Sequence, residues 1–434
     1  MKKENITIII DFKIYVYLFE PIINYIQSEG VKVFLFLPDE LRLDVEKILG
    51  VNDLIEYCSL SEIKSKHRLR FALHRTCSLL FTRTDFSFQF KKKREQITKS
   101  FPGMTGVLLK ISKYTPKVPN RMINRFLAFI SGVGLKNPFP TETIIVGSLN
   151  ASAELLGATN QEIITVMESW DHAVKEPNGY CSSVFLGWNN DLCNDWKRTQ
   201  GDLNCKIFHP LKLRYAKEVF VGTGKDEVKN KFRVMYPVAS TEKFSIKVLV
   251  DIERKLIKEL IEITYQLGWE LYIKPRPNGM ENEFSYADEY EHVEVGDVSH
   301  GDIKDPANYY YSSEDNLNRF KPLVNIDLVI NAFTTFGLDA AVAGLPVLQL
   351  DLREAVGFEV SEMVYNNYHI KQYLISSKNI IKPVDQNLSE CMQSQKSDFF
   401  EIATAYSQEL NSWLYTHENS MKAIDECFKE ILEF

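Results

Sequence analysis

Thr334 and Thr335 stand where a buried strand gives way to a helix, within the segment Asn331–Pro346. The apolar run Asp327–Asn331 predicts the strand, and the helix is expected to end at Gly344. The free N–H groups and positive dipole end of such a helix favour a phosphate, and the two hydroxyls can add hydrogen bonds. The alternative is that one threonine only caps the helix.

Two cations follow another strand, in the segment Tyr272–Pro277. Its two prolines end the strand at the carboxyl edge of the sheet, where ligands bind in open α/β folds. Lys274 and Arg276 are therefore expected to face the same crevice as the threonine helix. Seen alone they could be a solvated pair, but together with the threonines they favour a phosphate site. Ser240 is added to this predicted phosphate-binding set.

Three ionisable residues lie close together after another strand, in the segment Met167–Lys175. Glu168, Asp171 and His172 occupy a strand-to-loop transition, and general acid–base catalysis needs such groups near a substrate hydroxyl. The alternative is structural: Asp171 caps the next helix, His172 is a satisfied structural histidine and Trp170 packs. We predict Glu168 or Asp171 as the catalytic base, with His172 third.

A strand in the segment Val184–Asn190 is expected to end at a turn with an aromatic and an amide side chain. Trp188 and Asn189 could face the cleft, and with Trp170 they form a further set of candidate site residues. Core packing is an equally good interpretation of Trp188.

Strands alternate with helices along most of the sequence, which predicts parallel sheets covered on both faces. The chain has 434 residues, which favours two α/β domains. We predict domains over 1–220 and 221–385, followed by C-terminal helices over 386–434 that pack back on the first domain. The glycine-punctuated segment Gly222–Glu227 is the expected linker.

The composition limits the classes of function. Apolar residues make up 45% of the chain and the formal net charge is -7, which argues for a globular protein and against a nucleic-acid binder. The seven cysteines include no pair with C-x-x-C spacing, so we expect reduced thiols in the cytoplasm and no metal site. No stretch is apolar for the ~20 residues that a membrane span needs.

A basic stretch with interleaved apolar residues runs over Lys91–Ile130. It suits a polyanionic or lipid-linked acceptor, with peripheral association at the cytoplasmic face of the inner membrane. An ordinary helical pair with a solvated lysine face is the alternative.

Three of these segments, in their order along the chain, resemble segments of the GT-B-fold transferases that build bacterial surface carbohydrates. That group includes CDP-glycerol glycerophosphotransferase-like proteins and capsule and lipopolysaccharide transferases, some using CMP-Kdo. Glu168–Asp171 with Phe185–Asn189 is similar to the group's "SWD … VWN" pairing. Ile273–Pro277 resembles its "(K/R)PHP" strand end, and Asp327–Pro346 resembles its donor signature. The likeness covers roughly residues 165 to 350.

The resemblance implies two Rossmann-like domains facing each other across a cleft, the C-terminal one holding a nucleotide donor and the N-terminal one an acceptor. It implies metal-independent transfer with no cofactor, and a cytidine nucleotide as donor base. Two departures stand out. Arg276 replaces the group's frequent histidine, which keeps a phosphate contact but loses proton transfer. Asp339 replaces a commoner glutamate that would hold the donor's ribose or sugar.

The predicted function is transfer of a sugar, or a sugar-like group, from a nucleotide-activated donor to a growing surface polysaccharide or lipid-linked glycan. Lys274, Arg276 and the two threonines would stabilise the departing phosphate. A sugar-nucleotide 2-epimerase would use the same phosphate site without an acceptor. A catalytically degenerate protein that only binds nucleotide or glycan is the non-enzymatic alternative.

Overall fold

The computed structural model describes residues 4–12, 15–68, 72, 76–77, 80–81, 104–111, 114–116, 122, 138–148, 156, 161–168, 182–200, 204–217, 231–239, 247–276, 283–296, 313–353, 355–357, 380–381, 388, 392, 396–414 and 424–433. The chain divides into two compact units. Unit 1 contains Met1–Lys212 together with Tyr415–Phe434, and unit 2 is Leu213–Leu414.

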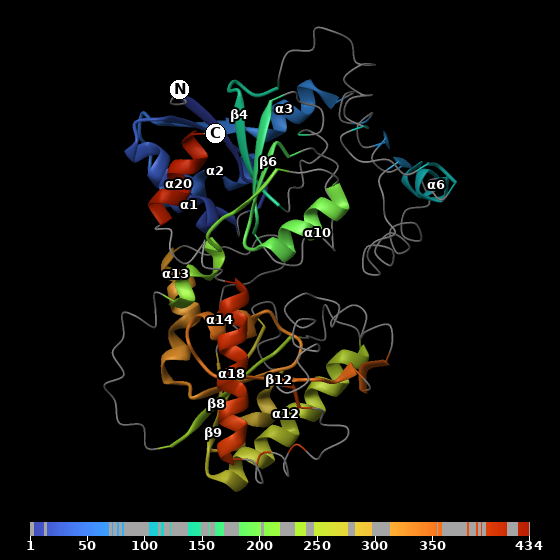
Figure 1. Ribbon diagram of the computed structural model, residues 1–434, viewed down its shortest axis with the longest axis vertical. Coiled ribbons are helices and arrows are strands. Elements are labelled where there is room, and N and C mark those ends of the chain that lie inside the picture. Colours follow the sequence, from blue (N-terminus) through green and yellow to red (C-terminus); the bar gives the residue numbers. More distant parts are fainter. Residues whose placement is uncertain are drawn as a thin grey trace. The chain divides into compact units, whose positions relative to one another are not determined.

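Unit 1 is built on a seven-stranded parallel sheet with the order β3-β2-β1-β4-β5-β6-β7. Figure 1 shows this sheet in blue to green, with its strands β4 and β6 labelled. Its strands are β1 (Asn5–Ile9), β2 (Lys32–Leu37), β3 (Ile55–Ser59), β4 (Thr143–Gly147), β5 (Glu162–Val166), β6 (Val184–Gly187) and β7 (Cys205–Ile207). The central strands are runs of buried β-branched residues, which is typical of a sheet covered on both faces.

The helices of unit 1 include one that comes from far along the chain. They are α1 (Val16–Ser28), η2 (Asp39–Leu41), α2 (Arg42–Leu49), α3 (Leu60–Lys66), α6 (Met104–Ile111), α10 (Asn190–Gln200) and α20 (Ile424–Glu433), and η3 (Leu211–Leu213) ends at the border with unit 2. The ring of Phe428 in α20 lies 5.5 Å from that of Tyr25 in α1 and 6.0 Å from that of Phe208. These aromatic contacts fix α20 in unit 1.

Unit 2 contains a six-stranded parallel sheet with the order β10-β9-β8-β11-β12-β13. Its strands are β8 (Arg233–Pro237), β9 (Glu270–Lys274), β10 (Val293–Val295), β11 (Leu328–Asn331), β12 (Val347–Leu350) and β13 (Ile380–Ile381). The chain winds outward from β8 to β10 and then restarts on the other side of β8 with β11. Such a reversal is the topological switch point of a Rossmann-like sheet, where ligands bind beyond the carboxyl ends of the strands.

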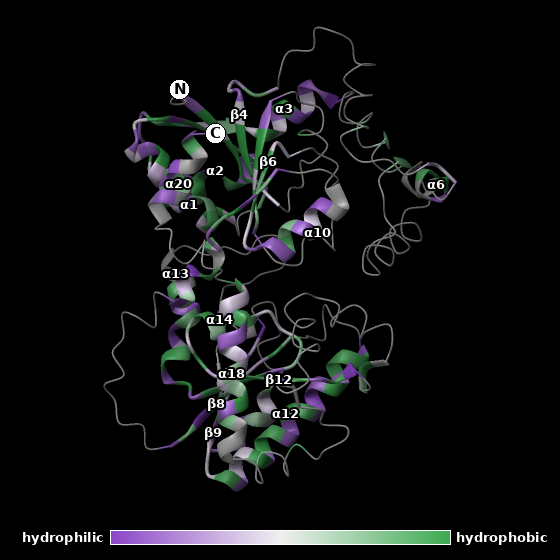
Figure 2. Cartoon of the chain, in the orientation of Figure 1, coloured by the Kyte–Doolittle hydropathy of each residue, from purple (hydrophilic) through white to green (hydrophobic). Residues whose placement is uncertain are grey.

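The helices of unit 2 are α12 (Lys247–Leu267), η4 (Ser285–Ala287), α13 (Ser313–Phe320), η6 (Lys321–Asn325), α14 (Phe336–Val342) and α18 (Lys396–Leu414). Hydrophobic and hydrophilic residues alternate along α12, because one side of this helix packs on the sheet core (Figure 2). α14 ends at Val342 and is followed by Gly344, whose φ of 83° allows the amides of Gly344 and Leu345 to bond back to the carbonyls of Ala341 and Ala340.

α18 holds the short helix α14 in place through side chains that reach its last turn. Ser407 donates a hydrogen bond to the carbonyl of Leu345, and Asn411 donates one to the carbonyl of Ala341, each at 2.5 Å. The Ala341 carbonyl lies in the last turn of α14, and the Leu345 carbonyl lies in the turn that follows this helix. The site that α14 carries therefore depends on α18.

The predicted fold class is confirmed, with two parallel α/β sheets and strand bounds that agree closely with the sequence. The C-terminal helices differ from the prediction, since α18 belongs to unit 2 and only α20 joins unit 1. The expected linker Gly222–Glu227 lies outside the described residues, as does most of Lys91–Ile130. Among the helices that are described, none has the length and apolar character that crossing a bilayer requires.

Candidate functional site

The carboxyl ends of β9, β8 and β11 bring the predicted phosphate-binding segments together in unit 2. Lys274 is the last residue of β9, and its carbonyl accepts a hydrogen bond from the amide of Val238 just beyond β8. β11 pairs with the other side of β8 and leads into Thr334 and Thr335. Three loops thus leave the same edge of the sheet at its switch point.

The Lys274 side chain crosses this edge and reaches the start of α14. Its Nζ lies 5.0 Å from the ring centroid of Phe336, the first residue of that helix. A cation at this distance over an aromatic face is attracted by the ring quadrupole. The structure therefore places Lys274 beside the threonine turn, although β8 separates their strands in the sheet.

The ammonium of Lys274 is surrounded by protein, although the residue as a whole is partly exposed. Burial, followed by repulsion from the Arg319 guanidinium, lowers the pKa of Lys274 to about 7, while the Asp339 carboxylate acts in the opposite direction. The Lys274 ammonium thus lies within electrostatic reach of one cation, Arg319, and one carboxylate, Asp339. A bound anion would stabilise its charged form.

Arg319 and Phe320, at the end of α13, extend this cluster and were missed in the sequence. The guanidinium carbon of Arg319 lies 5.3 Å from the Phe320 ring centroid, and Phe320 stacks on Phe336 with centroids 6.0 Å apart. Arg319, Phe320, Phe336 and Lys274 therefore form a row of cation, ring, ring and cation, which we call the cation–aromatic row. A basic residue beside an aromatic one was the only available signal, and that pair is common in surface helices.

The two threonines differ in their bonding. The Thr334 hydroxyl donates to Asn331 Oδ1 at 2.9 Å and accepts from the Phe336 amide at 3.0 Å. Thr334 therefore caps α14, as the structural alternative proposed. Thr335 makes no side-chain capping hydrogen bond. Of the two, Thr335 has the hydroxyl better suited to a ligand.

Arg276 is exposed and donates a hydrogen bond from Nη1 to the carbonyl of Ala239 at 2.9 Å. The amide of Ala239 donates to Glu253 Oε1 at 2.8 Å, and the same oxygen accepts from Tyr236 Oη at 2.9 Å. Glu253 comes from α12 and is 1% exposed, so it fixes the end of β8 from within the core. The next residue, Ser240, lies outside the described residues.

Asp339 lies inside α14 and is buried. Its carboxylate acts on the Lys274 ammonium, as the pKa of that lysine shows. The predicted contact with a donor ribose or sugar stays a prediction, and burial favours the role of a counter-charge instead.

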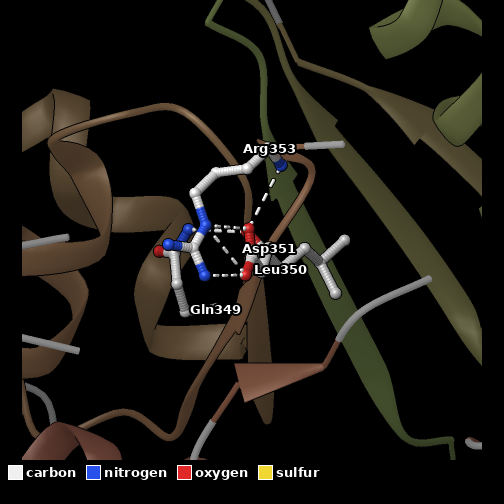
Figure 3. Close-up of polar contacts among 4 residues, drawn as sticks. All are labelled: Gln349, Leu350, Asp351 and Arg353. Atoms are coloured by element: carbon white, nitrogen blue, oxygen red, sulfur yellow. Dashed lines mark hydrogen bonds and ion pairs between the residues drawn. The ribbon is translucent and has the colours of Figure 1, made fainter. Parts of the chain in front are cut away.

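The end of β12 carries a further cation, but its charge is already balanced. Arg353 folds back on Asp351, with Nε 2.9 Å from Oδ1 and Nη2 2.6 Å from Oδ2 (Figure 3). The Asp351 side chain is buried, and its Oδ1 also accepts from the Arg353 amide at 3.1 Å. Such a bidentate ion pair is strong, and it fixes the orientation of the guanidinium group. We therefore exclude Arg353 from the anion site.

Glu168 follows β5 in unit 1 and is 3% exposed. Its amide donates to the Ser148 hydroxyl at 3.1 Å, and its carboxylate lies directly against Gly147 at the end of β4. The other predicted acid–base residues, Asp171 and His172, lie outside the described residues together with Trp170. The assignment of the base stays a prediction.

Trp188 and Asn189 have clear structural roles. The Trp188 indole is 1% exposed and donates to the carbonyl of Met167 at 3.0 Å. Asn189 Oδ1 accepts from the Leu192 amide at 3.0 Å, which caps the start of α10. Core packing and helix capping explain both residues, so contact with an acceptor stays a prediction.

Comparison with known proteins identifies the architecture. No protein-family model matches the chain, and no curated protein matches it significantly in sequence. A structure of S. aureus MnaA with UDP has a TM-score of 0.51 at 10% identity, covering 100% of this chain and 95% of that one. The UDP-GlcNAc 2-epimerase of Neisseria meningitidis, bound to UDP-GlcNAc, has a TM-score of 0.50 at 12% identity, covering 99% and 98%. The chain has the GT-B fold.

Within this GT-B chain, unit 2 holds the cation–aromatic row at the switch point of its sheet. In the part of the chain that the structure describes, no three histidine, cysteine, aspartate or glutamate side chains gather as metal ligands would. Lys274 and Arg319 place two cations at this end of the sheet, where an anionic ligand can bind.

Substituting Gly147 with alanine is expected to destabilise unit 1 by about 1–3 kcal/mol. An ideal Cβ at this position would lie 1.7 Å from Glu168 Oε1, so the carboxylate must move. Thermal unfolding of Gly147→Ala, Glu168→Ala and the double variant measures the coupling. Gly147→Ala should cost much less in the Glu168→Ala background. Equal costs in both backgrounds would show that the carboxylate lies elsewhere.

Proposed function

We propose that this chain is an enzyme acting on a nucleotide-activated sugar and that unit 2 binds the phosphate of this donor. The observation that carries the proposal is the position of Lys274 Nζ, 5.0 Å from the Phe336 ring at the switch point of a Rossmann-like sheet. Lys274 and Arg319 supply charge, and Thr335 supplies a hydroxyl. Arg276 follows the same strand as Lys274 and bonds to Ala239 just beyond the neighbouring strand β8. This combination suits a phosphate ester better than a neutral ligand.

The proposed reaction is glycosyl transfer. An acceptor hydroxyl attacks the activated sugar carbon, the bond to the donor phosphate breaks, and the nucleotide leaves with its negative charge. Lys274 and Arg319 accelerate this step insofar as they bind the departing phosphate more tightly than the intact donor. Glu168 or Asp171 takes the proton of the acceptor hydroxyl, with His172 as the third candidate.

The proposed acceptor is a growing bacterial surface polysaccharide or a lipid-linked glycan, with the enzyme in the cytoplasm. The resemblance to capsule and lipopolysaccharide transferases supports this, as does the basic stretch Lys91–Ile130. Peripheral binding to an anionic membrane would follow from that stretch. Co-sedimentation with vesicles of anionic and of neutral lipid tests it, and equal partition to both would contradict it.

A second candidate is a sugar-nucleotide 2-epimerase, which acts on the donor alone. The solved structure from Neisseria meningitidis, which matches this chain over 99% of its length, is such an enzyme. Incubation with UDP-GlcNAc in D2O without acceptor separates the two reactions. A new sugar epimer with deuterium at C2 would establish the epimerase, whereas transfer would need an acceptor.

Calorimetric titration with UDP-, GDP-, CDP- and CMP-linked sugars tests the proposed function itself. We expect at least one donor to bind, and we expect Lys274→Met to weaken it. Lys255→Met, an exposed lysine of α12, is the matched control and should bind like the unmodified protein. Failure of every donor to bind would refute the proposal. Binding without turnover, with or without acceptors, would identify a degenerate binding protein.

Donor binding should take up protons above about pH 7. In the free protein, burial and Arg319 lower the pKa of Lys274 to about 7. A bound phosphate stabilises the charged lysine and raises its pKa, so affinity should fall as the pH rises through the range between the two pKa values. Calorimetry near pH 8 in two buffers with different ionisation enthalpies measures the uptake, which Lys274→Met should abolish.

A further inference from the structure

Two of the cysteines lie against each other in unit 1, at the edge of its sheet. Cys193 belongs to α10 and Cys205 begins β7, the last strand in the order of the sheet. The Cys205 thiol donates a hydrogen bond to the carbonyl oxygen of Cys193 at 3.7 Å, and the two thiols are near enough that each shifts the pKa of the other. Nothing in the proposed donor chemistry uses either residue.

The backbone around this pair gives the Cys193 sulfur its position. An ideal Cβ at Gly187, the last residue of β6, would come within 2.4 Å of Cys193 Sγ. Only a residue without a side chain leaves this space, so the thiol of α10 can lie over the end of β6 and beside β7. Cys205 pairs with Phe185 in the sheet, which fixes the second sulfur on a regular strand.

The two thiols differ in exposure and in acidity, as a nucleophile and its resolving partner do. Cys205 is partly exposed, and the hydrogen bond from Cys193 lowers the pKa of its thiol, with the Lys197 ammonium acting in the same direction. Cys193 is buried, and its hydrogen bond with Cys205 and its burial raise the pKa of its thiol. Burial raises the pKa of Cys58 to about 11 and also raises that of Cys77.

We propose that Cys193 and Cys205 form an oxidant-sensitive dithiol that closes to an intramolecular disulfide when the protein meets a peroxide. The Cys205 thiolate attacks one peroxide oxygen, the O–O bond breaks, and hydroxide departs. Cys205 is then a sulfenic acid. The Cys193 sulfur then attacks the Cys205 sulfur, the S–O bond breaks, and water leaves as the S–S bond forms. In total, two thiols lose two electrons and two protons, and hydrogen peroxide becomes two waters.

The disulfide would tie α10 to the edge strand β7. β7 has three residues and, in the described sheet, pairs with β6 alone. Few backbone hydrogen bonds therefore hold it in place, and a disulfide to α10 would add a covalent link. α10 begins at the turn that Asn189 caps, directly after the buried Trp188. Oxidation is therefore expected to stiffen the segment that links β6, α10 and β7.

Peptide mapping of the full-length protein tests the proposal. The reduced protein is treated with a small excess of hydrogen peroxide under native conditions, alkylated, and digested without reductant. We expect a Cys193–Cys205 disulfide peptide, two hydrogens lighter than the sum of its parts and reversed by dithiothreitol, while Cys58 remains alkylated. If Cys58 is oxidised as fast as Cys205, or no linked peptide forms, the proposal is wrong.

Single substitutions separate the two roles. Cys193→Ser should stop the reaction at the sulfenic acid, so that Cys205 becomes labelled by dimedone, whereas Cys205→Ser should give neither product. Cys58→Ser is the matched control and should form the disulfide at the unmodified rate. Circular dichroism checks that each variant is folded before oxidation. Dimedone labelling of Cys193 in place of Cys205 would overturn the assignment of the nucleophile.

Discussion

Replacing Lys274 with methionine is expected to weaken binding of the sugar-nucleotide donor by about ten- to a hundredfold. A hydrogen bond to a charged group contributes about 1.5–3 kcal/mol, and each 1.4 kcal/mol corresponds to about tenfold in affinity. Methionine keeps the length and apolar contact with Phe336 but removes the charge that the phosphate needs. Calorimetric titration of both proteins with the donor measures the difference.

Two controls separate lost binding from lost structure. The buried ammonium and the repulsion from Arg319 oppose the charged form of Lys274, so Lys274→Met should fold at least as stably as the unmodified protein. Arg353→Met removes a cation that is already paired with Asp351, and it should leave donor affinity nearly unchanged. If both variants lose affinity equally, the effect is general electrostatics and the site assignment fails.

Replacing Gln349 with leucine is expected to lower the free energy of unfolding of unit 2 by about 3–5 kcal/mol. Gln349 is fully buried on β12. Its Oε1 accepts from Asn331 Nδ2 at 2.7 Å and from Tyr406 Oη at 3.3 Å, while its Nε2 donates to the carbonyl of Ala332 at 2.8 Å. Leucine fills the space but leaves several buried polar groups unsatisfied. Urea denaturation with a unit 2 probe such as Trp269 measures the loss.

Tyr406→Phe is the matched control for this prediction. It removes one donor to Gln349 and leaves the other hydrogen bonds of the amide intact, so the expected loss is about 1 kcal/mol. Asn331 also bonds the carbonyl of Thr334 at 3.0 Å, so Gln349→Leu should loosen the threonine turn and weaken donor binding as well. Equal stability of Gln349→Leu and the unmodified protein would contradict the role of this network.

The strands could be predicted because each is a short run of apolar, often β-branched residues, which by itself indicates a buried strand. The strand predicted over Asp327–Asn331 is β11 (Leu328–Asn331), and the strand that the prolines of Tyr272–Pro277 end is β9 (Glu270–Lys274). The order of the strands was not predicted, since it depends on contacts between segments far apart in the chain. α18 and α20 were treated as one group for the same reason: their partners, α14 and α1, lie far away in the sequence.

The candidate site was predicted where a rule about strand ends applies. Lys274 and the Thr334 turn lie close together because parallel strands place their carboxyl ends at one edge. Arg319 was missed because its place depends on how Phe320 stacks on Phe336. For Trp188 the sequence left two alternatives open, because an aromatic residue after a strand looks alike in sequence whether it faces a substrate or the core.

Unit 1 is completed by a helix that the ribosome makes after all of unit 2. Until α20 emerges, Tyr25 and Phe208 lack the ring of Phe428 that covers them, and the newly made first sheet keeps apolar surface open to solvent. During the time between synthesis of the first sheet and synthesis of α20, the exposed apolar surface of unit 1 can aggregate or bind chaperones. A chain that ends at residue 414 would contain all of unit 2 but lack α20, so unit 1 would stay incomplete and sensitive to proteolysis.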